Sequence, residues 1–144
     1  MLIRNCSGGV VFWEDNVLIL KNEKGEWSFP KGVIKNERTP NEVATARVRY
    51  ESGVKAEIVS PVGETSYEFY STTRRKPVCN RINWFVMEAE KPEVSINKME
   101  GFTDGGFYNF NDALEMITYS QDQSLLKYAY NKYKESSERK AELV

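Results

Sequence analysis

Residues 27–54, WSFPKGVIKNERTPNEVATARVRYESGV, contain the most clearly bounded helix of the chain. Thr39 is followed three residues later by Glu42, which is the pattern of a capping box at a helix N-terminus. Pro40 stands at the first helical position, where its missing N–H costs nothing. Gly53 is a typical left-handed residue just after a helix. The sequence therefore predicts a helix that begins at Pro40 and ends before Gly53.

Segments rich in aliphatic, aromatic and β-branched residues lie on both sides of this helix and predict strands. They cover residues 2–13, 17–20, 27–29, 55–60, 67–70, 78–88 and 107–108. Gly8 and Gly9 in the first strand indicate a bulge or a close approach of another backbone segment. Residues 91–106 are rich in charge and glycine and are predicted to be irregular.

Two more helices are expected towards the C-terminus. Asn109 or Asn111 caps the first, which ends at Ile117, and Ser120 opens the second. The second is amphipathic, with one apolar side made of Leu125, Leu126, Ala129 and Tyr133. The charged residues from 135 to 144 are predicted to form a frayed tail.

Strands thus come before, between and after the helices, without regular βα alternation. This order predicts an α/β fold of the α+β type, with a mixed sheet between helices. A chain of 144 residues corresponds to one domain, which we expect to cover residues 1–134.

Composition limits the partners. Lys and Arg number 20 against 21 Asp and Glu, so no overall positive field attracts extended nucleic acid or an anionic membrane. No basic segment precedes an apolar run near Met1, and no apolar stretch is long enough to span a bilayer. We therefore expect a cytoplasmic protein without membrane contact.

The chain has no histidine, which excludes Ser-His-Asp and Cys-His catalysis and the commonest zinc ligand. Cys6 and Cys79 form no CxxC pair and are predicted to be reduced and buried. Any chemistry must use carboxylates, Lys, Arg or Tyr.

The helix region resembles the Nudix box, a signature of Gly, five residues, Glu, seven residues, Arg-Glu, an aliphatic, any residue, Glu-Glu, any residue, Gly and an aliphatic. Gly32 and Gly53 are 21 positions apart, as the signature requires, so the register is unambiguous. The matching residues are Gly32, Val48, Glu51, Gly53 and Val54. The preceding residues 27–32 look like the lead-in found in Nudix enzymes that act on dinucleoside polyphosphates.

In the same register, four charged positions of the signature are replaced. The first Glu falls on Arg38, and the Arg-Glu pair falls on Ala46 and Arg47. The first residue of the Glu-Glu pair is Tyr50. Arg38 and Arg47 therefore reverse the sign of the charge that the signature has at these positions.

The resemblance implies a Nudix αβα sandwich and hydrolysis of a nucleoside diphosphate linked to another group, with Mg²⁺ or Mn²⁺ held by the box helix. The remaining candidate metal ligands are Glu51 and the carbonyl of Gly32. Glu100 stands about where related enzymes carry an additional acidic residue, and it is the second catalytic candidate. Its rivals in the same role are Glu64, Glu68 and Asp104.

Two hypotheses follow. In the first, the protein binds a nucleotide or nucleoside-diphosphate ligand with impaired or absent hydrolysis and needs no metal cofactor. In the second, it is an active Mg²⁺-dependent pyrophosphohydrolase, acting on a dinucleoside polyphosphate or a compound like ADP-ribose. Its metal would be held by Glu51 and acidic residues outside the box.

The candidate ligand-binding residues are Lys31, Gly32, Arg47, Tyr67, Arg74 and Arg75. Arg47 either pairs with Glu51 four residues later or binds a diphosphate with its planar fork. Arg74 and Arg75 belong to a basic loop that is either solvated or a phosphate clamp.

Tyr67, Phe69 and Tyr70 either stack on a base or pack in the core. Alternation puts Tyr67 and Phe69 on one face of the strand and Tyr70 on the other, so at least one of these rings is expected in the core. If the aromatics are exposed, they would suit a homodimer.

Overall fold

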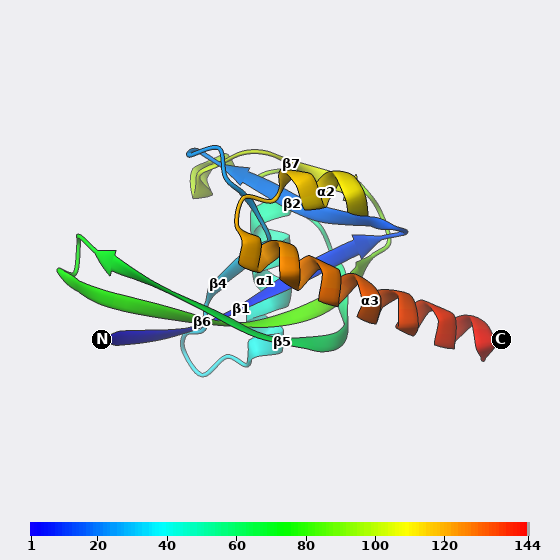
Figure 1. The fold of residues 1–144 in the computed structure, drawn as a ribbon, viewed down its shortest axis with the longest axis horizontal. Helices are drawn as coiled ribbons and strands as arrows, with labels where there is room; N and C mark the ends of the chain where they lie inside the picture. Colours follow the sequence, from blue (N-terminus) through cyan, green and yellow to red (C-terminus); the bar gives the residue numbers. More distant parts are fainter. Residues whose placement is uncertain (144) are drawn as a thin grey trace.

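A mixed sheet lies between helices in the computed structural model, which describes residues 1–143 (Figure 1). The strands are β1 (Leu2–Trp13), β2 (Asn16–Asn22), β3 (Trp27–Ser28), β4 (Lys31–Val33), β5 (Ala56–Ser71), β6 (Lys76–Ala89) and β7 (Phe102–Asn109). The helices are α1 (Pro40–Ser52), α2 (Phe110–Met116), α3 (Ser120–Glu142) and a short 3₁₀ helix, η1 (Lys98–Glu100).

The sheet is mixed, as predicted, because β1 runs parallel to β6 while the other neighbouring strands are antiparallel. The main order is β3-β2-β1-β6-β5. β1 and β2 pair only next to their turn, at Phe12 with Val17 and at Trp13 with Asn16. Further along, β4 pairs with β1 and β7 pairs with β2, so the sheet divides into two branches.

Alternating residues of the central strands supply two separate cores. Val10 and Phe12 of β1 belong to the core that includes residues of α2 and α3. Val11, between them in sequence, packs in the other core with Ala44 and Val48 of α1. Helices therefore cover both faces of the sheet, which confirms the predicted αβα sandwich.

The capping of α1 agrees with the prediction. The Thr39 hydroxyl accepts the backbone N–H of Glu42, and the Glu42 carboxylate accepts the backbone N–H of Thr39. Gly53 ends the helix with φ 72°, in the left-handed region, where a side chain would be strained.

The close approach predicted at the glycines of β1 is also observed. A Cβ atom on Gly8 would lie 2.5 Å from the carbonyl oxygen of Pro30. A Cβ on Gly9 would lie 2.4 Å from the sulfur of Met87. These two positions let the segment leading to β4, and the β6 side chains, pack directly on β1.

Several predicted boundaries are wrong. Residues 55–60 and 67–70 are not separate strands but parts of β5, which has 16 residues. Register shifts near Ser60 and Gly63 accommodate Pro61, which β5 tolerates because it is at the end of the strand order. The segment expected to be irregular contains η1 and the first half of β7, because β7 pairs with β2 from Asn22 onwards.

At the C-terminal end, Asn109 is the cap of α2, accepting the backbone N–H of Asp112. The apolar side predicted for α3 is buried. The predicted fraying from residue 135 is not observed, since α3 continues to Glu142, and Val144 lies outside the described residues. No helix within residues 1–143 is long and apolar enough to cross a membrane.

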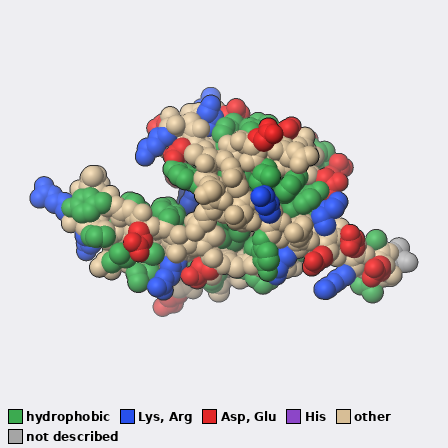
Figure 2. Space-filling model, in the orientation of Figure 1, with side chains coloured by type: hydrophobic (Ala, Val, Ile, Leu, Met, Phe, Trp, Pro, Cys, Tyr) green, Lys and Arg blue, Asp and Glu red, His purple; other side chains and the backbone are tan. Residues whose placement is uncertain are grey.

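The far ends of β5 and β6, with the start of β1, project from the body of the molecule as an arm (Figure 1). Figure 2 shows hydrophobic, basic and acidic side chains along this arm. Tyr67, Phe69 and Tyr70 are all exposed, at 41%, 38% and 62%. The expectation that at least one of these rings is core is therefore wrong, because the arm extends beyond the helices that cover the sheet.

Candidate functional site

Arg47 lies on α1 and crosses directly over Gly32 of β4. A Cβ atom at position 32 would be 2.5 Å from Cδ and Nε of Arg47, so only glycine leaves room for the arginine stem. The guanidinium carbon lies 5.1 Å from the centre of the Tyr50 ring, within the range of a cation–π contact. The absence of a side chain at Gly32 therefore lets the Arg47 stem pack directly on the backbone of β4.

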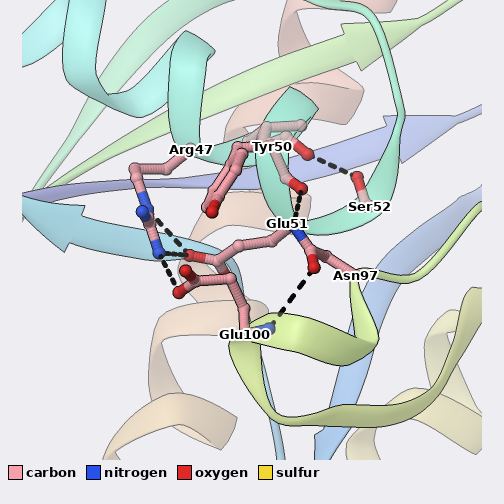
Figure 3. Close-up of polar contacts among 7 residues, drawn as sticks. Arg47, Tyr50, Glu51, Ser52, Asn97 and Glu100 are labelled. Atoms are coloured by element: carbon pink, nitrogen blue, oxygen red, sulfur yellow. Dashed lines mark hydrogen bonds and ion pairs between the residues drawn. The ribbon is translucent and has the colours of Figure 1, made fainter.

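The Arg47 guanidinium binds two carboxylates (Figure 3). Its Nη2 atom is 2.7 Å from Oε2 of Glu51, and its Nε donates to the same oxygen at 3.0 Å. The same Nη2 is 3.3 Å from Oε2 of Glu100. Glu51 is buried, with a relative exposure of 2%, whereas the side chains of Arg47 and Glu100 are 29% and 33% exposed.

Glu100 reaches this point because the loop before β7 covers the C-terminal end of α1. The backbone N–H groups of Ser95 and Asn97 donate to the carbonyls of Ser52 and Glu51, at 2.8 and 3.0 Å. The Asn97 side chain donates to the carbonyl of Tyr50 and accepts the N–H of Glu100 (Figure 3). These bonds satisfy the free carbonyls of the helix end and hold η1 beside it.

Burial raises the pKa of the Glu51 carboxyl to about 7, because the charged form has lost its hydration. The positive charges of Arg47 and Lys31 act in the opposite direction. Burial also lowers the pKa of Arg47, but the carboxylates of Glu51 and Glu100 outweigh it and raise the pKa overall.

Lys31, on β4, is near enough for its charge to act on Glu51, whereas the structure does not bring the remaining ligand-binding candidates to this point. Arg74 and Arg75 are at the tip of the projecting arm (Figure 1). The Tyr67 hydroxyl accepts a hydrogen bond from Asn80 at 2.8 Å, and its ring stacks on Phe69 within the arm.

Of the acidic candidates outside the box, Glu100 is the one that the structure places on Arg47. Glu64 and Glu68 are exposed on β5, and Asp104 is exposed on β7, where its carboxylate accepts the N–H of Gly105.

The sequence of this chain was compared with models of known protein families, and the result agrees with the box helix and the sandwich fold. A family model described as NUDIX domain matches residues 2–128. The chain belongs to the Nudix family. An RNA pyrophosphohydrolase from Marinomonas sp. (strain MWYL1) is 28% identical to this Nudix domain over 99 residues. The match covers 55% of this chain and 62% of that protein, so the Nudix domain spans less than two thirds of this curated relative's length.

Solved structures share the fold. An Ap4A hydrolase of C. elegans, in a binary complex, has a TM-score of 0.70 at 16% identity, covering 87% of this Nudix domain and 93% of that chain. A NUDIX hydrolase from Nitrosomonas europaea has a TM-score of 0.72 at 16% identity, with 92% and 72% covered. An ADP-ribose pyrophosphatase from Streptococcus suis has a TM-score of 0.68 at 16% identity, with 90% and 91% covered.

The side chains on the box face of this Nudix domain fit a divalent metal ion poorly. Mg²⁺ takes octahedral oxygen ligands, commonly carboxylates together with substrate phosphate oxygens. Glu51 and Glu100 are the carboxylates present here, and both are paired with Arg47. Within residues 1–143, no three His, Cys, Asp or Glu side chains are grouped as a metal site. A guanidinium therefore stands between the two carboxylates that an ion would need.

Asn97 positions Glu100, but the sequence alone did not identify Asn97 as a site residue. A signal was present, because Asn97 precedes a short turn that ends at Gly101, and asparagine followed by such a turn is typical of a cap. That signal identifies a cap but not the helix end that the cap contacts.

Proposed function

We propose that this Nudix domain binds a nucleotide or nucleoside-diphosphate ligand at the box helix and hydrolyses it slowly or not at all. The observation that carries the proposal is the ion pairing of Arg47 with both Glu51 and Glu100. Arg47 supplies one positive charge at the point where the Nudix signature places a carboxylate. A fixed cation binds phosphate but does not generate a hydroxide nucleophile as a metal-bound water does.

Arg47 has donors left for a ligand. Its contacts to Glu51 and Glu100 use Nε and Nη2, and within residues 1–143 no hydrogen bond engages Nη1. The Arg47 side chain is partly exposed, which supports access for a phosphate group. The names of the relatives, an RNA pyrophosphohydrolase, an Ap4A hydrolase and an ADP-ribose pyrophosphatase, support a nucleotide-type ligand.

The test is to rebuild the missing carboxylates. Arg47→Glu combined with Tyr50→Glu places three carboxylates together on one helical face with Glu51. A cation relieves the mutual repulsion of these carboxylates, so we expect the double variant to bind Mg²⁺ in a calorimetric titration. We expect the natural protein to give no heat of binding in the same titration.

A matched control is available on the same helix. Thr45→Glu combined with Arg49→Glu makes the same change in net charge at two exposed positions of α1 away from Arg47. This control is expected to bind no Mg²⁺. Equal binding by the two double variants would mean that general charge, rather than the box geometry, is responsible.

A thermal-unfolding assay identifies the ligand, because a compound that binds only the folded state raises the midpoint temperature of unfolding. ADP, ADP-ribose and dinucleoside polyphosphates are tested with and without Mg²⁺. We expect a rise in midpoint that does not require Mg²⁺ and is lost in Arg47→Ala. Hydrolysis of such compounds at ordinary enzymatic rates, abolished by Glu51→Gln, would overturn the proposal.

One observation favours the alternative of an active hydrolase. Glu100, outside the box, lies within reach of the same guanidinium as Glu51, so movement of Arg47 would leave two neighbouring carboxylates. In that case Glu100→Gln would reduce turnover, whereas Glu64→Gln, at an exposed position on β5, would not.

A further inference from the structure

A second feature of the box region is a hollow of about 460 Å³ beside Arg47, between α1 and the loop that follows β4. Three cationic side chains, Lys35, Arg38 and Arg47, line it, with Asn36 and Ala46 between them. The lining contains no acidic side chain. Its volume is within the range of small-molecule sites in proteins, about 300–1,000 Å³.

The hollow coincides with two of the replaced signature positions. The Nudix signature has Glu at position 38 and Arg at position 46, two side chains of opposite charge. Here, position 38 is Arg and position 46 is Ala. The short Ala46 side chain leaves space that an arginine would occupy, and Arg38 lines this space with a positive charge instead of a negative one.

The loop that carries the cations is tightly folded. Asn36 and Glu37 both have positive φ angles, 56° and 62°, and the N–H of Arg38 donates to the carbonyl of Lys35 at 3.2 Å. This turn brings Lys35 and Arg38 to the same hollow. Positive φ angles are uncommon for residues other than glycine and cost free energy. Two in succession persist only because contacts in the rest of the fold stabilise this loop conformation.

Lys35 and Arg38, unlike Arg47, form no ion pair with the neighbouring acids of the described residues. The Glu42 carboxylate is used by the capping box, where it accepts hydrogen bonds from Thr39. Within residues 1–143, no salt bridge involves Lys35 or Arg38. Arg47 is paired with Glu51 and Glu100, but Lys35 and Arg38 are two like charges at one hollow, and an anion there relieves their repulsion.

We propose that this hollow binds a phosphate group, and that it holds one end of the phosphate chain of the ligand whose other phosphates contact Arg47. The proposal rests on the proposed function for the identity of the ligand, but not for the anion site itself. Arg38 and Lys35 supply charge-assisted donors, and Asn36 adds a polar group to the lining. The preferred ligand therefore ends in a free phosphate or diphosphate, which a positive hollow accommodates better than an uncharged group.

Pyrophosphate is the probe that tests the site without a base. Calorimetric titration of the full chain should show binding that weakens about tenfold in Arg38→Gln and in Lys35→Gln, since each removes a charge-assisted contact. Arg49→Gln, an exposed position on the same helix, removes the same charge outside the hollow and should bind as the natural protein does. Equal weakening in Arg49→Gln would show general charge attraction and overturn the proposal.

A second variant separates space from charge. Ala46→Leu keeps all three cations and fills the hollow with an apolar side chain that a helix accepts readily. It should weaken pyrophosphate binding by at least tenfold while the unfolding midpoint without ligand stays close to that of the natural protein. Unchanged binding in Ala46→Leu and Arg38→Gln would overturn the phosphate site.

The two proposals fail in distinguishable ways. If ADP binds through Arg47 but Arg38→Gln and Ala46→Leu leave its affinity unchanged, the hollow is not the phosphate site and the proposed function stands. If pyrophosphate binding depends on Arg38 and Ala46 while no nucleotide binds more tightly than pyrophosphate, the hollow stands and the nucleotide ligand is wrong. A preference for ADP over ADP-ribose, in which the terminal phosphate is esterified and carries less negative charge, would support a free terminal phosphate, and the reverse preference would contradict it.

Discussion

The box helix α1 and the projecting arm carry the same kinds of side chain, arginines beside aromatic rings, in opposite environments. Arg47 lies between the Tyr50 ring and two carboxylates, one of them buried. In the arm, the guanidinium carbon of Arg4 lies 5.9 Å from the centre of the exposed Phe69 ring. Arg74 and Arg75 extend into solvent at the tip. A basic residue next to an aromatic therefore indicates a site only where the fold removes it from water and gives it a charged partner.

The largest expected difference between the two regions is in the stability of the fold. Above the pKa of Glu51, at about pH 9, Arg47→Ala leaves the buried Glu51 carboxylate without its partner, and breaking a buried pair in this way costs about 3 kcal/mol. Arg74→Ala should change the free energy of unfolding by less than about 0.5 kcal/mol, as exposed substitutions usually do. Urea unfolding followed by tryptophan fluorescence measures both. Equal effects would mean that Glu51 is not held by Arg47.

The next difference concerns pH. Because burial raises the pKa of Glu51 to about 7, the folded chain holds more protons than the unfolded chain between pH 4.5 and 7. The free energy of unfolding therefore falls as pH rises through this window, by at most about 3 kcal/mol. Glu51→Gln should remove this fall, whereas Glu68→Gln on the arm should keep it. A Glu51→Gln variant with the natural pH dependence would contradict the prediction.

A smaller effect is expected where the loop joins the box helix. Asn97→Ala removes the bond to the Tyr50 carbonyl and the cap of η1, a loss of about 1–2 kcal/mol. Hydrogen exchange at the amide of Glu100 should become faster. Ser95→Ala is the control, since Ser95 bonds to Ser52 through its backbone and should leave both measurements unchanged. Unchanged exchange in Asn97→Ala would show that the backbone carbonyl of Asn97, to which the Glu100 N–H also donates, protects this amide without the side-chain cap.

The smallest effect lies within the arm. Tyr67→Phe removes the acceptor of the buried Asn80 amide, which costs about 1 kcal/mol. Tyr70→Phe should cost less than about 0.5 kcal/mol, because Tyr70 is the more exposed ring. Thermal unfolding of the two variants compares them directly. If they are equally stable, the hydrogen bond from Asn80 to the Tyr67 hydroxyl contributes nothing measurable to the stability of the arm.

Local signals in the sequence were sufficient for the helix ends and for the box register. Thr39, Glu42 and Gly53 act on the backbone within a few residues of themselves, so their effect does not depend on the rest of the chain. The continuous apolar run from Val17 to Leu20 is likewise typical of a strand buried on both faces, and its residues lie alternately in the two cores. The spacing between Gly32 and Gly53 identified the family.

Strand length and exposure were not predictable in the same way. Pro61 and Gly63 suggest a break, yet pairing with β6 carries β5 through both by register shifts. Nothing local distinguishes Tyr67 in an exposed arm from a tyrosine in the core, because exposure depends on where the helices end relative to the sheet.

The sequence by itself determined the helix α1, the two-faced strands and the replacement of the box carboxylates by Arg38, Arg47 and Tyr50. Only the tertiary structure decided that Glu100, 53 residues from Arg47, meets it. It also decided that Lys35, Arg38 and Arg47 surround one hollow. The physical reason is that capping and periodicity act over a few residues, whereas contacts between distant side chains depend on sheet register and on how loops close.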